Sequence, residues 1–265
     1  MNGTSSGKLH NRHALVTGAG SGIGAAIATA LVQSGACVTL AGRRAEPLEA
    51  LADRLGSENV CVLSGFDVTD ATAIAAGLDT ARQKFGPVAI LVNNAGEVAT
   101  AAFEKTALEM WNRVMAVDLT GVFQVTQAVL PDLKSIGNGA RIINIASTAG
   151  LTGYAYVAAY VAAKHGVVGL TRALALELAR TGITVNAVCP GFTDTPMIAR
   201  SIDTIVAKTG RSAEDAMKEL TKHNPQGRLV RPEEVADTVL WLASPAAQSI
   251  NGQAIAVAGG EVLGG

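Results

Sequence analysis

The chain has 265 residues, of which 49% are hydrophobic and 16% are charged, so it is too apolar and too weakly charged to be intrinsically disordered. Lys and Arg number 21 against 22 Asp and Glu, and the net charge is −1 with no long run of either sign. This balance excludes the basic surface that a nucleic-acid-binding protein needs. The 29 glycines and the low aromatic content of 4% favour tight turns and close backbone packing.

Residues 1–12 are polar and rich in Gly, Ser and Asn, which predicts a flexible segment without a secretory signal. No stretch reaches about 18 uninterrupted apolar residues, so no membrane partner is expected. The cysteines, Cys37, Cys61 and Cys189, are widely spaced and match neither a disulfide framework nor a metal-binding pair. The four histidines also lack metal-ligand spacing. We therefore expect a cytoplasmic protein that uses no metal.

Short apolar runs alternate with longer amphipathic stretches along the whole chain. Strands are expected over His13–Thr17, Cys37–Ala41, Val60–Leu63, Ile90–Val92, Arg141–Ala146, Thr184–Val188 and Ala254–Val257. Helices are expected over Gly22–Gln33, Ala45–Leu55, Ala71–Lys84, Leu108–Leu133, Ala155–Arg180 and Pro232–Ala243. The strands are continuously hydrophobic, which is typical of strands that helices cover on both faces. The sequence therefore predicts an α/β fold, with one doubly wound domain over residues 13–265 and a parallel seven-stranded sheet.

The alternation is interrupted at residues 192–226, where a charged helical stretch separates the sixth expected strand from the last helix and strand. No linker rich in Pro, Gly or Ser sets this insertion apart from the rest of the chain. We expect a lobe that covers the site, not a second domain.

The run Thr17–Gly24, TGAGSGIG, directly follows the first expected strand and opens the first expected helix. Its glycines permit a tight turn and let a pyrophosphate approach backbone N–H groups, while the helix N-terminus offers partial positive charge. A glycine-rich run alone is weak support, but this position between strand and helix predicts a dinucleotide site. The expected contacts are Gly18, Gly20, Ser21, Gly22, Ile23 and Gly24.

Three further motifs follow in order: Asn93-Asn94-Ala95-Gly96, Tyr160-Val-Ala-Ala-Lys164 and Pro190-Gly191. Together with the glycine run they resemble the classical short-chain dehydrogenases/reductases, which carry TGxxxGxG, NNAG, YxxxK and PG in this order and spacing. The resemblance runs from about residue 11 to residue 260. It implies a Rossmann fold and an NAD(P)-dependent oxidoreductase activity.

The second expected strand is followed by Gly42-Arg43-Arg44, where the adenosine ribose of a dinucleotide should lie. An acidic side chain at this point would bind the ribose hydroxyls of NAD, whereas a guanidinium pairs with the 2′-phosphate of NADP. Since the chain has arginines here, NADP(H) is favoured and NAD(H) is the alternative. On that alternative, Arg43 and Arg44 are only solvated charges at a helix entry.

The resemblance assigns further cofactor contacts to Asp67, Val68, Asn94, Ala95, Gly96, Pro190, Gly191, Thr193 and Thr195. Asp67 and Val68 would hold the adenine ring, although Asp70 just beyond leaves a helix N-cap region as the other interpretation. Thr195 would touch the carboxamide or the phosphates, and Lys164 would bind the nicotinamide ribose.

Tyr160 and Lys164 are four residues apart in an expected helix, so their side chains emerge on one face. The lysine ammonium would favour a phenolate and lower the pKa of Tyr160 toward the working pH, as a general acid/base requires. Ser147 follows the fifth expected strand at the ligand-binding edge, where its hydroxyl could hold the substrate oxygen. Tyr154 and Tyr156 have no lysine four residues later, so Tyr160 is the expected acid/base.

One position departs from the family pattern. Where the family usually has asparagine in a stretch like NLTG, this chain has Asp118-Leu119-Thr120-Gly121. An ionised aspartate accepts hydrogen bonds but cannot donate them as an amide does. Either the proton path to Lys164 differs from the family's, or Asp118 is protonated, or Asp118 only binds local backbone.

These features predict hydride transfer between nicotinamide C4 and a substrate carbonyl, with Tyr160 supplying the proton and Ser147 polarising the oxygen. The expected substrate contacts are Ser147, Tyr154, Tyr160 and Phe192, under the insertion. The pattern is closest to 3-oxoacyl-thioester reductases and 3-hydroxyacyl-CoA dehydrogenases, with aryl or cyclic ketone reductases as the alternative.

Two other classes of protein fit less well. A catalytically silent, cofactor-binding regulatory protein would lose Tyr160 or Lys164, and this chain keeps both. An epimerase acting on nucleotide sugars needs a larger C-terminal domain. By resemblance we expect a homotetramer, and the apolar stretches Val114–Leu130 and Ala158–Leu178 fit that, although burial within a monomer produces the same pattern.

Overall fold

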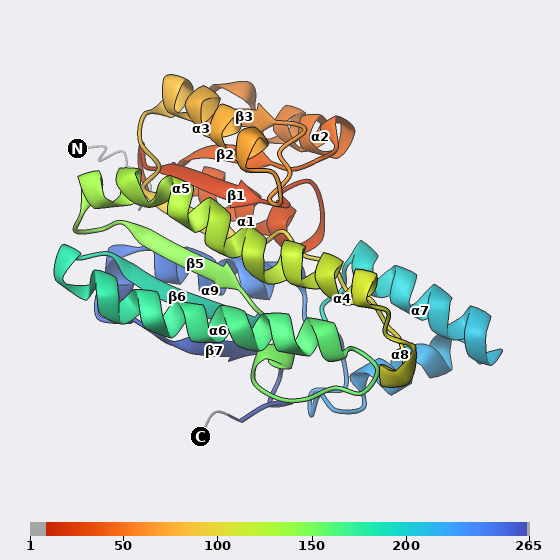
Figure 1. Ribbon diagram of the computed structural model, residues 1–265. Coiled ribbons are helices and arrows are strands. Elements are labelled where there is room, and N and C mark those ends of the chain that lie inside the picture. The colour runs from red at the N-terminus through yellow and green to blue at the C-terminus, as the bar shows by residue number, and fades with distance from the viewer. Residues whose placement is uncertain (1–8, 264–265) are drawn as a thin grey trace, which may run out of the picture.

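The computed structural model describes residues 9–263 (Figure 1). Its centre is one parallel sheet with strand order β3-β2-β1-β4-β5-β6-β7. The strands are β1 His13–Thr17, β2 Cys37–Ala41, β3 Val60–Leu63, β4 Ile90–Asn93, β5 Arg141–Ile145, β6 Thr184–Pro190 and β7 Ala254–Val257. The chain winds outward from β1 to β3 and then crosses back to place β4 on the other side of β1. Such a reversal opens a crevice at the carboxyl ends of the strands, where ligands bind in sheets of this kind.

Helices cover both faces of the sheet, and a pair of them extends beyond it (Figure 1). They are α1 Gly22–Gln33, α2 Ala45–Leu55, α3 Ala71–Phe85, α4 Leu108–Met115, α5 Gly121–Ile136, α6 Ala158–Leu178, α7 Pro196–Thr209, α8 Ala213–Thr221 and α9 Pro232–Ala243. The fold is the doubly wound Rossmann-like arrangement that the sequence predicts. The insertion expected at residues 192–226 contains α7 and α8.

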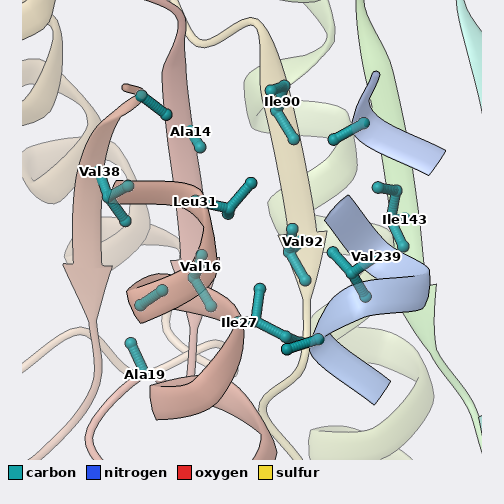
Figure 2. Packing of buried hydrophobic residues seen from close by; sticks show 14 of the residues in the cluster. Ala14, Val16, Ala19, Ile27, Leu31, Val38, Ile90, Val92, Ile143 and Val239 are labelled. Atoms are coloured by element: carbon teal, nitrogen blue, oxygen red, sulfur yellow. The ribbon is translucent and has the colours of Figure 1, made fainter. Parts of the chain in front are cut away.

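The two hydrophobic clusters on either side of the sheet explain the continuously apolar strands. In β1, Ala14 and Val16 belong to the cluster that includes α1 and α9, whereas Leu15 between them belongs to the cluster on the opposite face. Figure 2 shows Leu31 of α1 and Val239 of α9 packed on strand side chains of the first cluster. Because successive strand side chains point to opposite faces, a sheet buried on both faces needs an apolar residue at every position.

The helix expected over Leu108–Leu133 is divided in the structure. Between α4 and α5 lies a π-helical turn, Ala116–Thr120, and α5 continues to Ile136. Asp118 lies in this turn and is fully buried. The sequence predicts one continuous helix over this stretch and does not predict the turn. Turns of this kind occur often at functional sites.

The continuous helical stretch Leu108–Ile136 is long and apolar enough to cross a membrane by length and composition alone. Within the fold, however, Val125, Val129 and Leu133 of this stretch belong to the core on one face of the sheet. That packing accounts for its apolar character.

The N-terminal boundary differs from the sequence-based expectation. Residues 1–8 lie outside the described residues, but Leu9 is fully buried in the core. The Arg12 guanidinium donates a hydrogen bond to the Ala243 carbonyl at 3.1 Å and another to the Gly139 carbonyl. A flexible segment reaching residue 12 is therefore wrong for residues 9–12, because an apolar side chain and a carbonyl-bound guanidinium hold them against the fold.

The helix expected over Ala155–Arg180 begins later, at Ala158, and ends at Leu178 before a 3₁₀ turn. Tyr156 has a backbone φ of +68°, which no helix accommodates, and this delays the start. The strand expected to end at Val188 continues to Pro190, and the one expected to reach Ala146 ends at Ile145.

Candidate active site

The glycine run forms a tight turn between β1 and α1. Gly18 and Gly22 have φ values of +64° and +53°, in the region that glycine enters without strain. A Cβ on Gly24 would lie 2.5 Å from the Asn94 side-chain nitrogen and would overlap the Gly18 carbonyl oxygen. Ser21 at the N-cap of α1 makes no side-chain cap hydrogen bond, so the first-turn N–H groups remain available to an anion. The turn is shaped to receive a phosphate group closely.

Asn94 joins this turn to the end of β4. Its side-chain nitrogen donates to the carbonyls of Thr17 at 2.9 Å and Gly18 at 3.2 Å. The backbone N–H groups of Asn94 and Ala95 both donate to the Thr17 hydroxyl, at 2.9 and 3.0 Å. The glycine motif and the NNAG motif thus form one structural unit, and the Asn94 amide is committed to holding the turn.

At the adenosine end, the Arg43 and Arg44 side chains are exposed beyond β2. Asp67 accepts hydrogen bonds from the Thr69 N–H at 2.9 Å and the Thr69 hydroxyl at 2.8 Å, and these lower the pKa of Asp67, with a smaller contribution from Arg43. The N-cap of α3 is Asp70, not Asp67. Since both Thr69 bonds fall on Asp67 Oδ1, the other carboxylate oxygen is free to meet a ligand, as the adenine-ring assignment requires.

Thr195, beyond β6, lies beside the glycine turn. A Cβ on Gly22 would be 3.0 Å from Thr195 Cγ2, and the Thr195 hydroxyl caps α7 by accepting from the Ile198 N–H. Thr193 donates to the Gly191 carbonyl at 2.9 Å, which fixes the turn after Pro190. The expected phosphate-binding residues and the residues after β6 therefore lie on one continuous edge of the sheet.

Lys164, Asp118, Tyr160 and Ser147 come together at the ends of β5 and α6. The Lys164 Nζ donates to the Ile145 carbonyl at 3.1 Å and lies 3.2 Å from Asp118 Oδ1. The same Nζ lies 5.5 Å from the centre of the Tyr160 ring. The Ser147 hydroxyl accepts from the Ala149 N–H, and its interaction with Tyr160 lowers the pKa of Tyr160.

The charges in this cluster act against each other. Burial raises the pKa of Tyr160 and the Lys164 ammonium lowers it, but burial outweighs the ammonium, and Asp118 adds to the rise. The sequence predicts a lowered pKa for Tyr160, and that prediction is wrong, because the pKa is raised. Lys164 does lower the pKa of Tyr160, as the sequence predicts, but burial raises it by more. Burial lowers the pKa of Lys164, but the negative charges of Asp118 and Tyr160 outweigh that effect and raise it. Lys164 is held as an ammonium.

Of the three alternatives that the sequence leaves open for Asp118, binding of local backbone alone is wrong, because Asp118 also contacts Lys164. It accepts from the Glu97 backbone N–H, at 3.2 and 3.3 Å to its two oxygens, and it pairs directly with Lys164. Burial raises the pKa of Asp118 while the Lys164 ammonium opposes that rise. Because its two partners are donors, the arrangement suits the carboxylate. A Cβ on Gly96 would lie 2.6 Å from Asp118 Oδ1, which explains why the last residue of NNAG is glycine here.

On the expected substrate side, Tyr154 packs edge-to-face on Phe192 with ring centres 5.9 Å apart. The Tyr154 hydroxyl donates to Glu261 Oε1 at 2.6 Å and lies 2.8 Å from the Thr148 hydroxyl. Burial and the Glu261 carboxylate both raise the pKa of Tyr154. Sequence reasoning missed Glu261, since a single carboxylate near the end of the chain carries no motif and no periodic signal.

Among the residues that the structure describes, no group of three or more His, Cys, Asp or Glu side chains is arranged to hold a metal ion. The geometry instead offers a cradle for a dinucleotide. At Gly18, Gly22, Gly24 and Gly96 a Cβ would meet atoms of the protein itself, so glycine lets these segments pack closely along the same edge as the Tyr160 cluster.

Comparisons with known proteins agree with this arrangement. Residues 12–223 match the family described as short chain dehydrogenase. The chain is 40% identical to D-beta-hydroxybutyrate dehydrogenase of Cupriavidus necator over 92% of this chain and 95% of that protein. It is 41% identical to cis-4-hydroxycyclohexanecarboxylate dehydrogenase of Sinomonas cyclohexanicum over 94% and 96% of the two chains. A single-residue variant of actinorhodin polyketide ketoreductase, solved with NADPH, superposes with a TM-score of 0.87 at 43% identity and covers 94% of this chain and 97% of its own.

Proposed function

The chain belongs to the short-chain dehydrogenase/reductase family, NAD(P)-dependent oxidoreductases that act on CH–OH groups, and from that premise we propose that it interconverts a 3-oxoacyl thioester and the corresponding 3-hydroxyacyl thioester. The observation that carries the proposal is the cluster at the carboxyl ends of the strands, where the Lys164 Nζ lies 5.5 Å from the centre of the Tyr160 ring and Ser147 interacts with Tyr160.

In the reduction direction, Tyr160 gives its phenolic proton to the substrate oxygen, and Ser147 donates a hydrogen bond to that oxygen as negative charge develops on it. Lys164 stabilises the resulting phenolate, because its ammonium is held near the ring by the Ile145 carbonyl and Asp118. The cofactor, when bound, supplies or accepts the hydride. In the oxidation direction the same groups act in reverse.

The residues present fit an NAD(P) cofactor. The glycine turn and the N-terminus of α1 would hold the pyrophosphate, Asp67 and Val68 the adenine ring, and Thr195 the nicotinamide end. NADP(H) is the preferred form on this proposal, because the exposed Arg43 and Arg44 guanidiniums follow β2 and Gly42 stands where an NAD site would have an acidic residue. The similar polyketide ketoreductase was solved with NADPH, which supports the same preference.

The thioester class rests on the likeness to that ketoreductase together with the stretch from Ser147 to Tyr156, which contains no charged residue. The alternative is a cyclic or aryl ketone, which the aromatic pair Tyr154 and Phe192 favours. The relative named for cis-4-hydroxycyclohexanecarboxylate is consistent with such a site.

The test is a screen of the purified protein with NADPH and with NADH against acetoacetyl-CoA, longer 3-oxoacyl thioesters, cyclohexanone and acetophenone. We expect oxidation of NADPH with the thioesters at the highest kcat/KM. Higher kcat/KM for the ring ketones would replace the thioester assignment by the alternative. Absence of NAD(P)H oxidation with every ketone would favour a cofactor-binding regulatory protein.

We also propose a homotetramer. Phe123 of α5 is 45% exposed and Leu176 of α6 is 83% exposed, so both long helices present apolar side chains to solvent in one chain. Analytical ultracentrifugation would show a tetramer, and sedimentation as a monomer at micromolar concentration would refute the assembly.

A further inference from the structure

The C-terminal segment Ala258–Glu261 lies against the base of the insertion. Gly259 and Gly260 have φ values of +62° and +95° and turn the chain sharply after β7. A Cβ on Gly259 would overlap the Asn224 side-chain amide, and one on Gly260 would lie 3.3 Å from the Pro225 ring. These two glycines, to which the sequence gives no role, let the segment fold closely enough to bring Glu261 to the substrate side.

The Glu261 carboxylate bridges the two loops that follow β5 and β6. Its Oε1 accepts from Tyr154, whose hydroxyl also contacts Thr148, the residue after Ser147. Its Oε2 would lie 2.8 Å from a Cβ on Gly191. Glu261 thus places a carboxylate between the loop that carries Ser147 and the turn that receives the nicotinamide end.

Among the residues that the structure describes, no ion pair includes Glu261. The stretch from Ser147 to Val157 contains no Lys or Arg, and residues 190–196 contain Asp194 but no Lys or Arg. Lys164, the cation of the Tyr160 cluster, is already paired with Asp118. On the insertion, Lys218 and Lys222 pair with glutamates of their own helical stretch. The Glu261 carboxylate on the substrate side therefore has no ion-pair partner within the described part of the chain.

We propose that Glu261 is a specificity-determining residue that selects uncharged carbonyl substrates, such as thioesters and esters, and disfavours free 3-oxo acids. This inference rests on the proposed function and narrows its substrate class. A carboxylate on the substrate would lie within a few Å of Glu261 in a partly desolvated site, where like charges repel strongly. An ester or thioester of the same carbon skeleton carries no charge and escapes that penalty.

The experiment compares acetoacetate with ethyl acetoacetate, which share the reacting 3-oxo group and differ in charge. We expect the kcat/KM of the wild type to be higher for the ester than for acetoacetate. In E261Q the kcat/KM for acetoacetate divided by that for the ester should increase roughly tenfold. Gln keeps an oxygen that accepts from Tyr154, so E261Q removes the charge with little change in packing. Higher ionic strength should reduce the ratio of kcat/KM for the ester to kcat/KM for acetoacetate in the wild type, and it should leave this ratio unchanged in E261Q.

Tyr154→Phe is the matched control, because it removes the hydrogen bond to Glu261 and retains the carboxylate. We expect the acid-to-ester ratio of Y154F to stay near that of the wild type, even if both KM values rise. If Glu261 had a purely structural role, E261Q and Y154F would behave alike: the KM values for acetoacetate and for the ester would rise, and the ratio of the two kcat/KM values would not change. That result would overturn the inference.

Binding separates this inference from the proposed function. The Kd of each compound is measured by isothermal titration calorimetry on the protein with NADP⁺. If acetoacetyl-CoA and both of these compounds are not turned over, the proposed function fails, but a tenfold change in the Kd ratio of E261Q still supports charge selection. An unchanged Kd ratio, or tighter wild-type binding of acetoacetate than of the ester, contradicts it.

Discussion

Lys164 and Asp118 form an ion pair inside the protein, with 3.2 Å between Nζ and Oδ1 and side-chain exposures of 5% and 0%. An asparagine at position 118, the residue usual in the family, would leave the site one unit more positive. The π-helical turn between α4 and α5 brings the Asp118 carboxylate against the ammonium. The pair therefore weakens the positive field that Lys164 exerts on Tyr160.

Asp118→Asn should retain or raise activity. Removing the carboxylate removes one cause of the raised pKa of Tyr160, so that pKa should fall. Alcohol oxidation needs the phenolate, so its rise with pH should move to lower pH, and the rate below that rise should increase roughly two- to tenfold. The rate of ketone reduction, which falls at high pH, should begin to fall at a lower pH than in the wild type. The check is the pH dependence of kcat/KM in both directions.

Asp132→Asn is the control for this variant. Asp132 is also nearly buried and paired with an arginine, Arg82 at 3.0 Å, but it lies away from the Tyr160 cluster. Loss of the Asp132 carboxylate should lower the stability of the fold and leave the pH dependence of kcat/KM unchanged. A total loss of activity in D118N, with D132N active, would show that the Asp118 carboxylate has a chemical role of its own.

Arg43→Ala should weaken NADPH binding by roughly ten- to a hundredfold and change NADH binding little, since a guanidinium that pairs with the 2′-phosphate has no partner in NADH. Fluorescence titration with both cofactors measures the two Kd values. Arg54→Ala, at the far end of α2, is the control for loss of an exposed charge. If wild-type protein binds NADH more tightly than NADPH, the preference for NADP(H) is refuted.

Gly24→Ala should destabilise the fold by about 1 to 3 kcal/mol and impair cofactor binding, because the new methyl group meets the Gly18 carbonyl and the Asn94 amide. Gly169→Ala is its counterpart in α6, where a Cβ meets nothing within 4 Å, and the helical propensity of alanine should stabilise that variant by about 0.5 to 1 kcal/mol. Thermal unfolding and cofactor titration check both. Equal effects of the two substitutions would contradict the tight packing described for the glycine turn.

Local patterns in the sequence were sufficient for the strands and for most helices. The apolar runs at β1, β2, β3 and β7 have the bounds that the sequence predicts. In β1 every residue is buried, and burial on both sheet faces produces such an uninterrupted apolar segment. The helical spacing of Tyr160 and Lys164 likewise predicts that they share one face, and the structure places both beside Ser147.

Features that depend on contacts between distant residues could not be predicted in this way. The Lys164–Asp118 pair joins residues 46 positions apart through a π-helical turn, and the Tyr154–Glu261 bond joins residues 107 positions apart. The net direction of the Tyr160 pKa also depends on burial, which spacing does not report. Leu9 looks like part of a polar segment until the core that receives it is known.

The most direct test of the account is the Tyr160→Phe variant, measured for NADPH binding and for single-turnover oxidation of NADPH with a ketone that the wild type reduces. Phenylalanine keeps the ring beside Lys164 and removes only the hydroxyl group whose proton goes to the substrate oxygen. We predict NADPH binding within about threefold of the wild type and a rate lowered by roughly 10³-fold or more. A Tyr160→Phe variant that keeps turnover near the wild-type rate would contradict the account.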